Sequence, residues 1–103
     1  MTKPLRFDND AVEEMEMAAG WYEARHQDLG IDFVTAVREA LQRVAEAPQT
    51  WPLVRGVPER LNVRRFLLRR FPYSVVFVEL DAEIRVLAIA HTSREPGFWR
   101  TRL

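Results

Sequence analysis

The order of apolar and polar positions divides the first quarter of the chain into a short strand and a helix. Residues 5–7 have the pattern of a strand and are followed by three residues that can cap a helix, Asp8, Asn9 and Asp10. Apolar side chains then return at the three- and four-residue steps of one helix face, at Val12, Met15, Ala19 and Tyr22. We predict that this helix ends near residues 27–28, with Gly30 as its C-terminal stop.

A second apolar stripe predicts a second helix directly after the first. The stripe consists of Phe33, Val37, Leu41 and Val44, and it is widened by Ile31, Val34 and Ala40. The pattern stops before Pro48. Because the joint is so short, the two helices should form an antiparallel hairpin. The helix acids Glu13, Glu14, Glu16 and Glu23 are expected on its solvated face.

The second half of the chain predicts a loop and then three strands. Prolines and a glycine mark residues 48–61 as the loop. Three apolar runs separated by short turns follow it and predict strands at residues 62–69, 73–80 and 84–91. The tail around residues 95–100 should form one helical turn. The predicted fold is α+β with the order β-α-α-β-β-β, an antiparallel sheet with the helix hairpin packed on one face, in a single domain over residues 1–103. We expect the other face of the sheet to stay available for binding.

The net charge of zero conceals two unlike halves. Residues 1–50 carry five basic and ten acidic side chains, a net charge of −5, and residues 51–103 carry ten basic and five acidic ones, a net charge of +5. Every basic residue except Lys3 is arginine, whose planar fork suits carboxylate and phosphate groups. The sequence therefore favours a basic working surface in the second half, directed at an anionic partner.

Several classes of protein are disfavoured by what the sequence lacks. It has no cysteine, which excludes disulfides, thiolate catalysis and cysteine-bound metals. No apolar run approaches the roughly 18 residues of a membrane span, and the first residues do not resemble a signal peptide. His26 has no partner at metal-ligand spacing. We expect a soluble, cytoplasmic protein without membrane contact, cofactor or metal site.

Short motifs along nearly the whole chain, in a fixed order, resemble one family. They are Ala19-Gly20-Trp21-Tyr22-Glu23, Phe33 with Leu41, Pro48 to Pro52, Arg69-Arg70-Phe71-Pro72-Tyr73, Val86 to His91, and an ending with Arg94, Pro96, Phe98 and Trp99. Together with the order of elements, they resemble the toxins of the RelE/ParE superfamily, which includes the ParE-like plasmid stabilisation proteins. The chain is thus identified as resembling the toxin half of a bacterial type II toxin–antitoxin pair.

The resemblance implies one of two activities on the same scaffold. ParE-like toxins poison DNA gyrase, whereas RelE-like toxins enter the ribosomal A site and cleave mRNA. Both are held inactive by an antitoxin whose flexible C-terminal segment wraps the toxin. Our first interpretation is a ParE-like gyrase inhibitor, which is not an enzyme, neutralised by a ParD-like antitoxin in a heterotetramer or larger assembly.

The alternative is a metal-independent, ribosome-dependent endoribonuclease of RelE type. Its base, acid and cationic groups would come from Arg65, Arg69, His91 and Arg94. Arg65 and Arg69 are four residues apart, so strand alternation would place them on one face. Against this interpretation, the chain has no lysine after Lys3, and Phe98 and Trp99 stand where nucleases of this type carry a tyrosine. A third possibility is a degenerate toxin that serves only as an antitoxin-binding module.

The resemblance and the charge pattern together predict two binding surfaces, one for the antitoxin and one for the target. The antitoxin surface comprises Arg64, Arg65, Arg69, Arg70 and Trp21, although the arginines alternatively form a solvated edge or pair with the acidic helices. The target surface comprises Arg94, Trp99 and Arg100 in the tail. Phe98 and Trp99 should anchor the tail and leave its arginines, including Arg102, displayed, while the tail contributes little to the core. His91 would then be a strand-end residue hydrogen-bonded to the tail.

Overall fold

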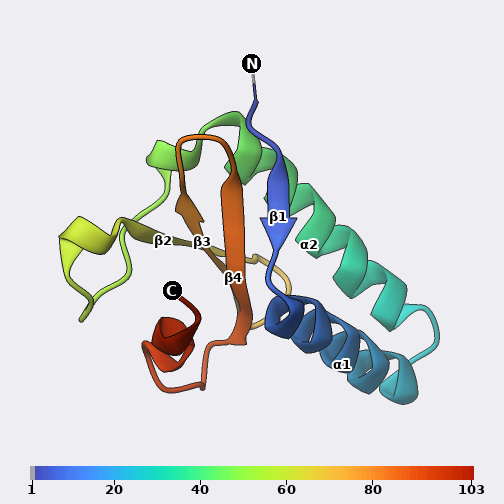
Figure 1. Cartoon of the computed structure of the whole chain (residues 1–103). Coiled ribbons are helices and arrows are strands. Elements are labelled where there is room, and N and C mark those ends of the chain that lie inside the picture. The colour runs from blue at the N-terminus through green and yellow to red at the C-terminus, as the bar shows by residue number, and fades with distance from the viewer. Residues whose placement is uncertain (1) are drawn as a thin grey trace.

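The computed structural model describes residues 2–103 and confirms the predicted order of elements (Figure 1). The helices and strands are β1 (Leu5–Phe7), α1 (Asn9–Arg25), α2 (Leu29–Glu46), β2 (Val63–Leu67), β3 (Tyr73–Glu79) and β4 (Ile84–His91). Short 3-10 turns lie at Pro48–Thr50, Glu59–Leu61 and Phe98–Arg102. The last of these is the helical turn expected in the tail. No helix within residues 2–103 combines the length and the apolarity that crossing a membrane requires.

The four strands form one mixed sheet in the order β1-β4-β3-β2. The antiparallel pairing predicted for the last three strands is confirmed. β1 differs, because it joins β4 in parallel, with Leu5 opposite Ile84 and Phe7 opposite Val86. A parallel strand needs a crossover connection from one end of the sheet to the other, and the helix hairpin is part of that connection.

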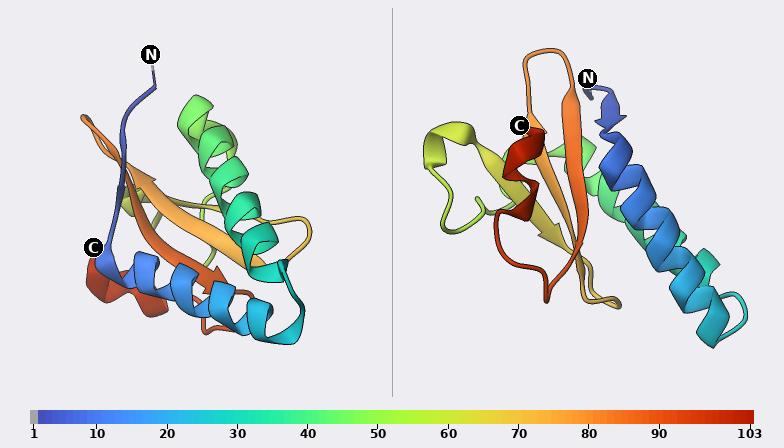
Figure 2. Two further views of the ribbon diagram at one scale, coloured as in Figure 1. Left: turned by 90° about the vertical axis from the view of Figure 1, so that its right-hand side faces the viewer. Right: turned by 60° about the horizontal axis from the view of Figure 1, so that its bottom comes forward.

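The helix hairpin covers one face of the sheet and encloses the first of two apolar clusters (Figure 2). The predicted stripe of α2 is buried at Phe33, Val37, Leu41 and Val44. Ile31, expected to widen the stripe, is instead 63% exposed, because it lies on the outer side of α2. On α1, Ala11 and Ala18 are buried, and the predicted stripe residues are only partly covered.

The joint between the helices differs from the prediction in its use of glycine. Asp28, with a φ of 70°, makes the left-handed reversal, and Gly30 lies inside the first turn of α2. Gly30 is therefore not a helix stop. A Cβ at this position would lie 2.6 Å from the Ala19 carbonyl oxygen, so glycine is required for the close approach of the helices. The Glu23 carboxylate, expected in solvent, accepts hydrogen bonds from the N–H groups of Asp28 and Gly30 and so caps α2.

The second face of the sheet is covered, contrary to the expectation that it would stay available. Its cluster contains Val63, Val76, Val78, Leu87, Ala88, Ala90 and Trp99, with Val54, Val57, Leu61 and Phe98 packed against it. The loop before β2 and the C-terminal turn supply this cover. The cause is that β3 and β4 are apolar on both faces, so each face needs a layer. The tail thus belongs to the core more fully than we expected.

Candidate functional site

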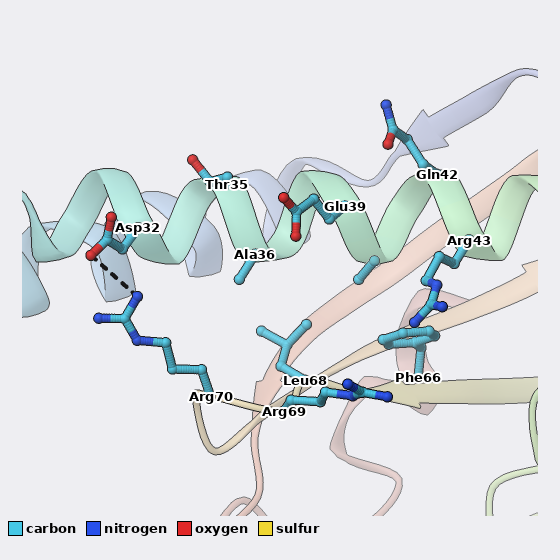
Figure 3. Close-up of a pocket in the computed structure, with 11 residues that line it drawn as sticks. Asp32, Thr35, Ala36, Glu39, Gln42, Arg43, Phe66, Leu68, Arg69 and Arg70 are labelled. Atoms are coloured by element: carbon cyan, nitrogen blue, oxygen red, sulfur yellow. Dashed lines mark ion pairs between the residues drawn. The ribbon is translucent and has the colours of Figure 1, made fainter.

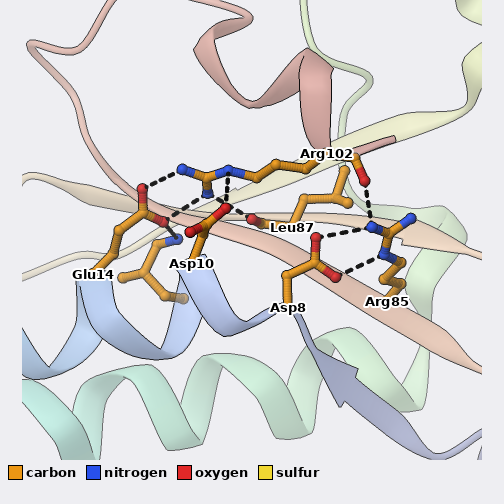
Figure 4. Close-up of polar contacts among 7 residues, drawn as sticks. Asp8, Asp10, Glu14, Arg85, Leu87 and Arg102 are labelled. Carbon is orange, nitrogen blue, oxygen red and sulfur yellow. Dashed lines mark hydrogen bonds and ion pairs between the residues drawn. The ribbon is translucent and has the colours of Figure 1, made fainter.

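Side chains from distant parts of the chain replace a missing strand at the outer edge of β4 (Figure 4). β1 pairs with β4 only as far as Val86. Beyond that point, the Ile89 N–H donates to the Glu14 carboxylate over 3.1 Å, and the Arg102 guanidinium donates to the Leu87 carbonyl over 2.8 Å. These contacts satisfy backbone groups that would otherwise form an open strand edge.

The same two side chains form a bidentate ion pair. Arg102 Nη1 and Nη2 lie 3.0 and 2.9 Å from the two Glu14 oxygens, and the side chains are only 15% and 17% exposed. The hydrogen bonds that Arg102 donates to Glu14, together with the Glu14 charge, raise the pKa of Arg102 above its ordinary value, despite the opposing effect of burial. Arg102 is therefore not displayed as predicted, and Glu14 is not on the solvated face. No local sequence signal links two residues so far apart.

A second ion pair joins β4 to the residue before α1, and its arginine also holds the end of the tail. Arg85 Nε and Nη2 lie 2.7 and 2.9 Å from the two oxygens of Asp8, and Arg85 also donates to the Arg102 carbonyl. The hydrogen bond to Asp8 raises the pKa of Arg85. The tail is thus held by two charge-assisted contacts as well as by its aromatic residues.

Three arginines gather at a cavity of about 270 Å³ between the sheet and the tail. We call it the basic pocket; its polar lining includes Arg55, Arg65, Ser74, His91, Thr92, Arg94 and Glu95. Arg65 lies on the same side of β2 as Val63, which belongs to the second cluster. His91 ends β4, Arg94 follows it in the turn, and Arg55 comes from the loop before β2.

The residue set proposed for a nuclease is only partly assembled. Arg65, His91 and Arg94 share the basic pocket, but Arg69 does not line it. β2 ends at Leu67, so strand alternation does not reach Arg69. Arg69 and Arg65 both border a groove beside Trp51, but Arg69 otherwise faces α2.

His91 makes the contacts expected of a strand-end residue. Its Nδ1 accepts a hydrogen bond from the Ser93 N–H over 3.0 Å and lies 2.7 Å from Ser93 Oγ. A neutral His91 ring therefore carries its proton on Nε2. The ring also meets Tyr73 edge-on at 5.0 Å between centroids. Burial raises the pKa of Tyr73, with a smaller contribution from Tyr22.

The four arginines predicted to bind the antitoxin differ in their surroundings. Arg64 donates to the Trp51 carbonyl over 2.7 Å and is half-buried. Arg70 pairs with Asp32 of α2 at 3.3 Å, as the alternative with the acidic helices predicts (Figure 3). Arg69 is exposed beside α2, in a groove that we call the hairpin groove. The residues that line this groove are Asp32, Thr35, Ala36, Glu39, Ala40, Gln42, Arg43, Phe66, Leu68, Arg69 and Arg70.

Trp21 lies on a separate, more apolar surface. It is 53% exposed and lines a groove that we call the α1 groove. The other residues that line this groove are Glu14, Met17, Ala18, Tyr22, Pro72, Tyr73, Ile89, His91 and Arg94. Its ring is covered on one side by the guanidinium of Arg25, at 3.7 Å. The α1 groove and the basic pocket share His91 and Arg94, so they meet at the end of β4.

The tail displays two of the three residues nominated for target binding. Arg94 and Arg100 are exposed, and the Arg94 guanidinium rests 3.8 Å from the centre of the Phe98 ring. Trp99 is only 2% exposed and packs in the second cluster. It therefore anchors the tail, as predicted, and is not itself on the surface. In the part of the chain that the structure describes, no group of three or more metal-ligating side chains is arranged to hold an ion.

Comparison with known proteins agrees with this architecture. The sequence model of the family described as the ParE toxin of the type II toxin–antitoxin system parDE matches residues 5–96. A solved structure, the chromosomal ParDE system from P. aeruginosa, superposes with a TM-score of 0.74 at 20% identity, over 87% of this chain and 96% of that one. At that identity the likeness shows the fold alone. None of the curated proteins matches the sequence. Because the family model covers most of the chain, the protein belongs to the ParE toxin family of type II toxin–antitoxin systems.

Proposed function

We propose that this protein inhibits DNA gyrase and is neutralised by a cognate antitoxin. Membership of the ParE toxin family supports this activity. The observation that carries it is the attachment of the tail to the core, which leaves Arg94 and Arg100 exposed beside a buried Trp99. A surface held in its binding conformation loses little entropy when a partner docks, so the fixed tail suits recognition of a protein target.

The incomplete nuclease set supports gyrase over mRNA as the target. Arg69 lies outside the basic pocket, and His91 Nδ1 is occupied by Ser93. The remaining residues of the set, Arg65 and Arg94, are arginines, which stay protonated and supply no general base at neutral pH. The arrangement therefore favours binding over proton transfer.

Arg100→Ala should lower gyrase inhibition about tenfold and leave the fold intact. Arg100 is exposed and forms no ion pair within residues 2–103, so its loss removes a target contact without disturbing the core. A tenfold loss corresponds to about 1.4 kcal/mol, which is modest for an interface arginine. The measurement is the toxin concentration that halves the rate of supercoiling by purified gyrase.

The matched control is Arg38→Ala, which removes an exposed arginine from the outer side of α2. It should inhibit as well as the parent protein. Equal inhibition by Arg100→Ala and the parent would show that the tail is not the target surface. A parent protein that leaves supercoiling unchanged at every concentration would refute gyrase as the target.

The antitoxin is proposed to cross the tip of the β2–β3 hairpin, from the hairpin groove to the α1 groove. The two grooves adjoin this tip, because Arg69 and Arg70 line one and Pro72 and Tyr73 line the other. Arg69 offers a cation to an acidic segment, and Trp21 offers an exposed aromatic surface. Tryptophan and arginine are the side chains that most often dominate binding energy.

Trp21→Ala combined with Arg69→Ala should weaken antitoxin binding about 10- to 100-fold. The expected loss combines an aromatic anchor with a charge-assisted hydrogen bond of about 1.5–3 kcal/mol. Titration calorimetry with the purified antitoxin measures it. Arg60→Ala, an exposed arginine in the loop before β2, is the matched control. If the double variant binds as tightly as the control, the antitoxin does not use this path.

A further inference from the structure

The basic pocket concentrates positive charge that the protein itself does not neutralise. Arg55, Arg65 and Arg94 make no ion pair with any residue from 2 to 103. Glu95 is the only carboxylate among the residues that line the pocket. By contrast, four other arginines each pair with a carboxylate of the same chain, namely Arg6, Arg70, Arg85 and Arg102. The pocket is thus electrostatically prepared for an external anion.

The walls of the pocket are held in place by the core. Its floor includes Val76, Ala90 and Trp99, all buried in the second cluster. Arg65 lies in β2, and its backbone N–H donates to the Pro52 carbonyl over 3.0 Å. The Arg94 N–H donates to the His91 carbonyl over 3.0 Å, and its guanidinium lies on the Phe98 ring. The backbone of Arg65 and Arg94 and the Arg94 guanidinium are therefore positioned before any ligand arrives.

The size and the donor set of the pocket fit a phosphate group better than a carboxylate. A carboxylate has two oxygens and is matched by a single guanidinium fork. The residues that line the pocket include three arginines, His91, Ser74 and Thr92, and together they carry more donors than one carboxylate requires. A terminal phosphate offers three acceptor oxygens and a charge near −1.5 to −2 at pH 7. A cavity of about 270 Å³ admits this group with part of an attached sugar.

From these observations we infer that the basic pocket binds the phosphate group of a nucleotide, either free or at the end of a nucleic-acid strand. The inference goes beyond the inhibition of gyrase, because it assigns this toxin a nucleotide contact of its own. It does not rest on that proposal, although Arg94 belongs to both surfaces: the pocket can bind a nucleotide whether or not the tail binds gyrase.

The test is an NMR titration of the isotope-labelled full chain with AMP and, in parallel, with adenosine. AMP should shift the backbone amides of Thr92 and Arg94, and adenosine, which lacks the phosphate, should not. In Arg65→Ala/Arg94→Ala the affinity for AMP should fall at least about tenfold, since two charge-assisted contacts are lost. Arg38→Ala/Arg60→Ala removes the same charge elsewhere on the surface and should bind AMP like the parent.

Further titrations distinguish a free nucleotide from a strand end, and a phosphate site from a carboxylate site. A short single-stranded oligonucleotide with a 5′-phosphate that binds more tightly than AMP supports a strand end, and equal affinity supports a free nucleotide. The inference is overturned if AMP shifts no pocket amide, or if the pocket and control variants bind it equally. It is also overturned if a glutamate-rich peptide displaces AMP at lower concentration than inorganic phosphate does, which would identify a carboxylate site. Thermal melts of both double variants should match that of the parent, because none of the substituted arginines forms an ion pair within residues 2–103.

Discussion

Phe33→Ala is expected to lower the free energy of unfolding by about 3–5 kcal/mol, which is a large part of the stability of a domain of this size. The Phe33 side chain is fully buried, and its ring lies 5.0–5.3 Å, centroid to centroid, from the rings of Tyr22, Phe71 and Tyr73. These contacts join α2 to α1 and to the tip of the β2–β3 hairpin. Removing the ring leaves a cavity that the surrounding strands and helices cannot close without losing their own contacts.

Urea denaturation followed by circular dichroism measures this effect. Ile31→Ala is the matched control, since it shortens an apolar side chain on the same helix, but one that is largely exposed. Its effect should stay within about 0.5 kcal/mol. A loss below about 1 kcal/mol for Phe33→Ala would show that the aromatic cluster does not hold the hairpin tip to the helices.

Glu14→Ala should lower the free energy of unfolding by about 2–3 kcal/mol, because it removes contacts both to the edge of β4 and to the tail. The change leaves the Arg102 guanidinium without its bidentate partner and the Ile89 N–H without an acceptor. Breaking a buried ion pair costs about 3–5 kcal/mol, and the residual exposure of both side chains reduces that figure. Since the pair also fixes the tail, gyrase inhibition should fall along with stability.

Three measurements separate this effect from general destabilisation. The Ile89 amide should exchange its hydrogen faster in Glu14→Ala, because its acceptor is gone. In a double-mutant cycle, Glu14→Ala and Arg102→Ala should be clearly non-additive. Asp32→Ala breaks the exposed pair with Arg70 and should cost no more than about 1 kcal/mol. Additive effects of the first two substitutions would mean that Glu14 and Arg102 act independently.

The sequence alone determined the elements and the family. The stripe from Phe33 to Val44 predicted the buried face of α2, because helical periodicity is a local property that survives in the folded chain. The apolar run of residues 84–91 predicted β4 with its observed bounds, because a continuous apolar run is also a local property of the chain. The ordered motifs pointed to a toxin family whose model matches residues 5–96.

Only the tertiary structure decided which residues meet. Glu14 and Arg102 are 88 positions apart, and Asp8 and Arg85 are 77 apart, so no periodicity relates them. The parallel pairing of β1 with β4 brings the start of α1 to the sheet edge and creates both contacts. β2 ends at Leu67, and Arg69, which lies beyond it, does not line the basic pocket as Arg65 does. Side-chain pattern specifies which faces are buried, whereas strand order and strand length depend on packing across the whole chain, and these placed the arginines of the basic pocket together.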